Sequence, residues 1–121
     1  MDANAEQLSR MLKVLSVGTR VRIVQLLKGR ALCVNALAGR LDVTQGAVSQ
    51  HLRILRDAGV VIDEKRGYYV HYRLNEEVLA EWREAIAGLL KAGTEDKSEK
   101  KGDRPCAAAM KARKGAGNRR T

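Results

Sequence analysis

The fold is constrained most by residues 37–59, which read LAGRLDVTQGAVSQHLRILRDAG. Asp42-Val43 separates two segments whose apolar residues have helical spacing, and in the second segment these are Val48, Leu52 and Leu55. Thr44 stands where the second helix needs a side-chain oxygen to accept a hydrogen bond from an unpaired N–H group. The stretch therefore predicts two short helices joined by a tight turn, a helix-turn-helix.

The side of the second helix opposite its apolar stripe carries amides, a hydroxyl and guanidinium groups, but no carboxylate. Such groups suit the base edges and phosphates of double-stranded DNA. His51 is isolated from other metal-ligating residues, so a structural or DNA-proximal role is favoured over metal binding. The alternative for this side is an ordinary solvated face. If this side recognises DNA, its DNA-binding residues are Thr44, Gln45, Ser49, Gln50, His51, Arg53 and Arg56.

A β-hairpin is predicted directly after this helix. Val60-Val61-Ile62 is β-branched, residues 64–67 form a turn that contains a glycine, and residues 68–74 supply the second strand. A hairpin at this position is a wing. We expect its tip, Lys65 and Arg66, to contact backbone phosphate or the minor groove.

Amphipathic helices are predicted on both sides of this unit. The first spans about residues 4–16, and the last begins after Asn75, whose side chain can cap it. Between them, Thr19 is expected to cap a second helix, and Cys33 to open a third after a short connector. The two terminal helices could simply close the core, but a short helix-turn-helix usually binds two half-sites as a symmetric dimer. We expect the dimer interface to include Leu8, Met11, Leu12, Leu15, Leu79, Trp82, Ile86 and Leu89.

These elements predict a mainly α fold with a small β-hairpin wing, an α+β winged helix-turn-helix with four helices, the wing and a fifth helix in residues 1–92. Residues 93–121 have only Met110 and Cys106 as side chains suited to burial and are predicted to be a disordered basic tail, either a solubilising terminus or an accessory DNA contact. The net charge of +9 suits a polyanionic partner.

Other functional classes find little support in the sequence. There is no Gly-rich phosphate loop, no acid pair in a plausible cleft and no nucleophile with a base, so no enzyme is expected. The N-terminus has no apolar signal region, and no apolar run approaches membrane-spanning length. With only two cysteines, a disulfide scaffold is not expected. We therefore expect a cytoplasmic protein that has no membrane partner.

Residues 12–74 resemble the ArsR/SmtB group of winged-helix repressors. The resemblance lies in the opening motif (Leu12–Ser16 and Thr19–Ile23), Leu32–Leu37, the recognition helix with the first wing strand (Val48–Val61) and Gly67–Leu74. It implies a homodimer that binds an inverted-repeat operator, represses transcription and releases DNA when a ligand binds or a thiol is modified. It also implies that the first and last helices form the dimer interface.

The sequence departs from the family's pattern at the sensing site. Arsenite and antimonite sensors of the family carry Cys-Val-Cys at the start of the third helix, where this chain has Cys33 and Asn35. Another family site, built from Asp, His and Glu, lies on the last helix, which here has no histidine, so zinc is poorly supported.

Cys33 and Cys106 remain as candidate sensing residues. They could bind As(III), Sb(III) or another thiophilic metal as inducer, because the linker of residues 93–105 has a reach of about 20 Å and lets Cys106 meet Cys33 of either protomer. They could equally form a disulfide or persulfide in a redox sensor. If neither senses, the protein is a constitutive architectural DNA binder.

Overall fold

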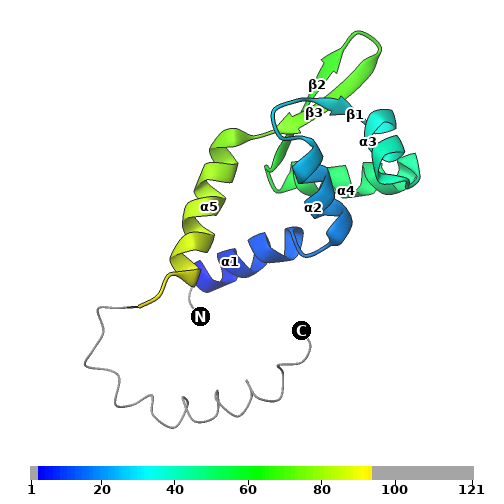
Figure 1. The fold of residues 1–121 in the computed structure, drawn as a ribbon. Helices are drawn as coiled ribbons and strands as arrows, with labels where there is room; N and C mark the ends of the chain where they lie inside the picture. Colours follow the sequence, from blue (N-terminus) through cyan, green and yellow to red (C-terminus); the bar gives the residue numbers. More distant parts are fainter. Residues whose placement is uncertain (1–2, 94–121) are drawn as a thin grey trace, which may run out of the picture. The chain divides into compact units, whose positions relative to one another are not determined.

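The computed structural model describes residues 3–93. Within this range the chain forms five helices and one three-stranded sheet (Figure 1). In chain order the elements are α1 (Ala3–Val14), α2 (Gly18–Leu26), β1 (Leu32–Cys33), α3 (Val34–Leu41), α4 (Gln45–Asp57), β2 (Val61–Arg66), β3 (Tyr69–Leu74) and α5 (Glu76–Leu90). The predicted architecture, a helix-turn-helix followed by a wing and flanked by terminal helices, is confirmed.

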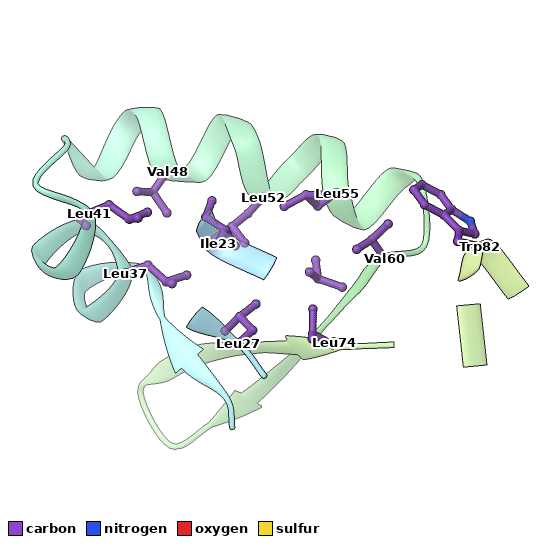
Figure 2. Close-up of a cluster of buried hydrophobic side chains, with 12 residues drawn as sticks. Ile23, Leu27, Leu37, Leu41, Val48, Leu52, Leu55, Val60, Leu74 and Trp82 are labelled. Carbon is purple, nitrogen blue, oxygen red and sulfur yellow. The ribbon is translucent and has the colours of Figure 1, made fainter. Parts of the chain in front are cut away.

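The core forms around the apolar stripe of α4. Val48, Leu52 and Leu55 are each no more than 1% exposed, because the 3.6-residue period brings them to the same side of the helix. Figure 2 shows these side chains packed against others from α2, α3, the strands and α5. Burial of each large side chain contributes about 1.5–3 kcal/mol to the free energy of unfolding. The labelled partners are Ile23, Leu27, Leu37, Leu41, Val60, Leu74 and Trp82.

The turn between α3 and α4 is built as the sequence predicts. Asp42 takes a left-handed conformation with φ 59° and ends α3, and the N–H of Val43 donates to the carbonyl of Ala38. Aspartate is one of the few non-glycine residues that adopt this conformation readily. The Thr44 hydroxyl then accepts a hydrogen bond of 3.1 Å from the N–H of Ala47. The predicted N-cap of α4 is confirmed.

The sheet contains one strand more than the sequence predicts. Its order is β1-β3-β2, and both pairings are antiparallel. Leu32 pairs with Tyr72 and Cys33 with His71, so Cys33 lies in a strand and caps α3 instead of opening it. The expected connector at this position is therefore wrong. Two residues are too few to show the alternating pattern of a strand, and their partner lies far along the chain.

The wing turn is also shorter than predicted. β2 extends through Lys65 and Arg66, which pair with Val70 and Tyr69, and only Gly67-Tyr68 connects the strands. Gly67 has φ 64°, which suits a two-residue hairpin turn. Lys65 and Arg66 therefore end a strand instead of forming the turn, although they remain at the outer end of the wing.

One predicted helix cap is wrong and another is confirmed. Thr19 lies inside α2, which begins at Gly18 and is preceded by an extended Val17 that makes no side-chain cap. Asn75 caps α5 as expected, since its Oδ1 accepts from the N–H of Val78 at 3.3 Å.

No helix within residues 3–93 is long and apolar enough to cross a membrane. The predicted tail lies outside the described residues, except for Gly93.

Candidate nucleic-acid interface

α4 presents a polar side to solvent because its opposite side is fixed in the core. The predicted contact residues on this helix and its cap, apart from His51, are exposed: Thr44, Gln45, Ser49, Gln50, Arg53 and Arg56. Gly46 and Ala47 are exposed among them and add no bulk. The helix therefore offers amides, hydroxyls and guanidinium groups on a rigid element, the arrangement that base recognition in a major groove requires. Its one carboxylate, Asp57, is at the C-terminal end.

Two of the predicted arginines make ion pairs within the protein. Arg56 lies 3.3 Å from Asp63, and Arg66 lies 3.1 Å from Glu64. All four side chains are between 38% and 53% exposed. Surface pairs of this kind contribute only about 0–1 kcal/mol, so an arginine can exchange its carboxylate for a phosphate at little cost.

Beside the predicted contact residue Lys65, the wing carries two exposed tyrosines that sequence reasoning did not assign to the interface. Tyr68, in the turn, is 99% exposed and Tyr69 is 58% exposed. Lys65 is exposed and makes no ion pair with any residue in the described range. Tyr68 was expected to occupy a strand, and only the shorter turn places it at the end of the wing.

His51 is half-buried and hydrogen-bonded within the domain. Its Nδ1 accepts from Nε of Arg20 at 3.2 Å, while another guanidinium nitrogen of Arg20 donates to the carbonyl of Val14 at 3.1 Å. Burial, and secondly the charge of Arg20, lower the pKa of His51 below its ordinary value of 6.5. This geometry favours the structural role for His51. Arg20, which sequence reasoning missed, joins α4 to α2 and to the end of α1.

Of the two candidate sensing cysteines, the structure places only one. Cys33 is half-buried, and its side chain makes no capping hydrogen bond to α3. Residues 3–93 contain no group of three or more His, Cys, Asp or Glu side chains able to hold a metal ion. Cys106 lies outside the described residues, and so does any site that would combine it with Cys33.

The predicted dimer-interface residues differ in how far the protomer itself covers them. Leu8 and Trp82 are buried within the protomer at 7% and 9% exposure, and Met11, Leu15, Leu79 and Ile86 are half-buried. Leu12 and Leu89 are 41% and 51% exposed, and Leu90, which was not among the predicted residues, is 74% exposed. α1 contacts α5 (Figure 1), and beside this contact lies an open hollow of about 580 Å³. It is lined by Asn4, Ala5, Leu8, Ser9, Leu12, Lys13, Ser16 and Leu89.

Comparison with known proteins identifies the family. Residues 18–63 match the family described as "Bacterial regulatory protein, arsR family". Over 72 residues the chain is 42% identical to the arsenical resistance operon repressor of Escherichia coli strain K12, covering 59% of this chain and 62% of that repressor. A solved structure described as "Possible transcriptional regulator for arsenical resistance" is 38% identical, with a TM-score of 0.63, over 67% of this chain and 84% of that chain. The chain belongs to the ArsR family of bacterial regulatory proteins.

A second solved structure bears on the fold of this ArsR-family chain. It is the homodimeric winged helix-turn-helix DNA-binding domain Mb0332 from Mycobacterium bovis. It is 26% identical with a TM-score of 0.59, and the match covers 76% of this chain and 91% of that one. The sequence-based predictions of the winged helix-turn-helix fold and of the ArsR family are thereby confirmed. The chain spans about 62% of the length of the Escherichia coli relative.

Proposed function

We propose that this ArsR-family protein is a homodimeric transcriptional repressor that binds an inverted-repeat operator in double-stranded DNA. The observation that carries the proposal is the exposed side of α4, which is polar and carries no carboxylate between Gln45 and Arg56. The core on its other side holds this helix in place, so it can enter a major groove without distortion of the domain. The wing follows directly and carries Lys65 and Tyr68 toward the adjacent backbone or minor groove.

A second copy of the chain is the proposed occupant of the apolar surface on α1 and α5. Leu12, Leu89 and Leu90 expose apolar area at this end of the protomer, next to an open hollow. Exposed apolar surface of this kind marks an interaction site. The Mb0332 domain, which is similar in fold, is homodimeric. Leu8 and Trp82 are already covered within the protomer, so the proposed contact rests chiefly on the exposed leucines.

The proposed inducer is a metalloid, another thiophilic metal or a thiol oxidant. Two observations support this class: Cys33 is half-buried directly before α3, and relatives of the chain are named for arsenical and arsenic resistance. The other predicted thiol, Cys106, would have to meet Cys33 from the tail. The competing function is a constitutive architectural DNA binder that senses nothing.

A DNase I footprint with and without arsenite or hydrogen peroxide tests the proposal. Protection of two half-sites that is lost with an inducer supports a sensing repressor. Protection that survives every inducer leaves the architectural function, and no specific protection removes the DNA-binding assignment to α4.

Arg53→Ala tests the assignment residue by residue. We expect it to weaken specific operator binding by about 1–3 kcal/mol if Arg53 contacts a base, with the fold intact. The matched control is Arg83→Ala, which removes an exposed arginine from α5, outside the helix-turn-helix and the wing. Equal operator affinity in Arg53→Ala and wild type by fluorescence anisotropy would contradict the role of Arg53.

A further inference from the structure

One arginine joins three helices of the protomer. Nε of Arg20, on α2, donates to Nδ1 of His51 on α4 at 3.2 Å, and Nη1 of Arg20 donates to the carbonyl of Val14 at 3.1 Å. Val14 is the last residue of α1, where the carbonyls have no partner within the helix. Because two of its nitrogens are engaged, the planar guanidinium group of Arg20 has a fixed orientation toward His51.

This contact determines which nitrogen of His51 carries the proton. An arginine side chain stays protonated and has no acceptor, so Nδ1 of His51 has to accept. Burial first, and then the charge of Arg20, lower the pKa of His51 below its ordinary value of 6.5, so the ring is neutral at neutral pH. A neutral imidazole that accepts at Nδ1 carries its proton on Nε2. Arg20 therefore makes Nε2 of His51 a hydrogen-bond donor.

The donor on Nε2 is not used within the described part of the domain. In residues 3–93 the side chain of His51 makes one hydrogen bond, the one from Arg20. The one buried side-chain nitrogen or oxygen in this range that lacks a partner is Nδ1 of His71, so Nε2 of His51 is accessible to solvent. Ala47, one helical turn earlier on the same side of α4, is exposed and carries only a methyl group.

His51 lies at the edge of the exposed side of α4. It is half-buried and stands between Gln50, which is exposed, and Leu52, which is buried. A helix with its side chains is about 10–12 Å wide, which is close to the width of about 12 Å of the major groove. The flanks of a helix in the groove therefore meet the phosphates that border it. A phosphate oxygen is a charged acceptor that suits a single N–H donor.

We propose that Arg20 is a positioning residue for DNA binding, which holds His51 so that its Nε2–H donates to a backbone phosphate of double-stranded DNA. The inference rests on the proposed function, because it concerns a DNA contact of α4. The structural role and the DNA-proximal role of His51 then use different nitrogens of one ring. Nδ1 serves the fold, and Nε2 serves the DNA. Such a contact carries no base preference, so it is measurable on a duplex of any sequence.

The tautomer is measured in the wild-type full chain by long-range ¹H–¹⁵N correlation NMR at about pH 7.5, a unit above the ordinary histidine pKa. Only His51 and His71 contribute, and His71→Gln assigns them. We expect His51 to be the Nε2–H tautomer in wild type and a mixture of tautomers in Arg20→Met, which has a long side chain without an N–H donor.

The same NMR experiment, repeated with a mixed-sequence DNA duplex, separates the DNA contact from a purely structural role. The duplex should shift the Nε2 resonance of His51 and leave its proton in place. An Nδ1–H tautomer in wild type, or an Nε2 resonance that bound duplex leaves unchanged, would overturn the proposal. Neither result depends on the folding of a variant.

Fluorescence anisotropy with the same duplex measures the size of the effect. We expect Arg20→Met to weaken binding about tenfold, the low end for a hydrogen bond to a charged group. In the His51→Ala background, where the contact is already absent, Arg20→Met should weaken binding no further. The matched control is Arg22→Met, which removes an exposed arginine from the same helix and should have the same effect with and without His51. Circular dichroism establishes that each variant is folded.

Failure of this inference and failure of the proposed function give different results. If wild type binds the duplex and Arg20→Met binds equally well, or loses as much affinity without His51 as with it, the positioning role is refuted and the DNA-binding function stands. If wild type binds no duplex at low salt, the DNA-binding assignment of α4 is refuted together with the contact.

Discussion

A single hydroxyl caps the start of α4. The hydrogen bond of 3.1 Å between Thr44 and the N–H of Ala47 satisfies one of the unpaired donors at the start of α4. We expect Thr44→Ala to lower the free energy of unfolding by about 0.5–2 kcal/mol, and Thr44→Ser to retain most of it. Urea denaturation followed by circular dichroism measures both variants. Equal stability of Thr44→Ala and wild type would show that water replaces this cap without cost.

The contact between Arg20 and His51 makes stability depend on pH. Because the pKa of His51 is lowered in the folded protein, chiefly by burial and also by Arg20, the unfolded chain binds the proton first as the pH falls. The stabilising contribution is complete above the ordinary value of 6.5 and is lost as the pH falls below it, toward the lower folded pKa.

His51→Gln removes this titration. Between about pH 7.5 and pH 5.5, on either side of the ordinary histidine pKa, the melting temperature of the variant should fall less than that of wild type. His71→Gln is the control, since it removes the only other histidine and leaves the Arg20 contact in place. A parallel decline in wild type and His51→Gln would contradict the assignment.

At the scale of elements, the sequence predicted the helices and caps that depend on local periodicity. The stripe of Val48, Leu52 and Leu55 identifies α4 because each residue falls one helical turn from the next. The cap at Thr44 follows from the same local chemistry. β1 was missed because its two residues become a strand only through pairing with residues on β3.

The same limit applied to the candidate sites. Exposed residues on α4 could be assigned from their helical phase, whereas the contact between Arg20 and His51 joins residues 31 positions apart. Contacts of this kind depend on the tertiary fold, and local patterns in a single sequence do not predict them.

The wing and α4 should contribute to DNA binding in different ways. Lys65 is exposed without an ion pair in the described range, which suits a phosphate contact. We expect Lys65→Ala to weaken operator and unrelated DNA by the same factor, and to reduce the slope of log affinity against log salt by about 1. Fluorescence anisotropy over a salt series measures this slope. A loss confined to the operator would instead assign a base contact to Lys65.

At the scale of the whole molecule, a single protomer buries the apolar side chains of its core but leaves those on α1 and α5 partly exposed. The core side chains of the helix-turn-helix are 0–3% exposed, while α1 and α5 leave leucines exposed; these core residues are Leu37, Leu41, Val48, Leu52 and Leu55. A small protein gains stability by burying such surface in an oligomer. The exposed leucines lie on the terminal helices, whereas α4 exposes polar side chains and Ile54. Two protomers can therefore join through α1 and α5 while α4 of each remains available.

Charge placed on this surface should separate the protomers without unfolding them. In Leu12→Glu/Leu89→Glu, two side chains that are 41% and 51% exposed become carboxylates. A like charge buried on both sides of a symmetric interface is strongly unfavourable, so we expect a monomer in sedimentation experiments. Val21→Glu is the matched control, because Val21 on α2 is 39% exposed and lies outside the proposed interface. The monomer should retain its circular dichroism spectrum and bind an isolated half-site, but lose the added affinity for two half-sites that linkage of two DNA-binding units provides. A double variant that sediments as a dimer would place the contact between copies elsewhere on the molecule.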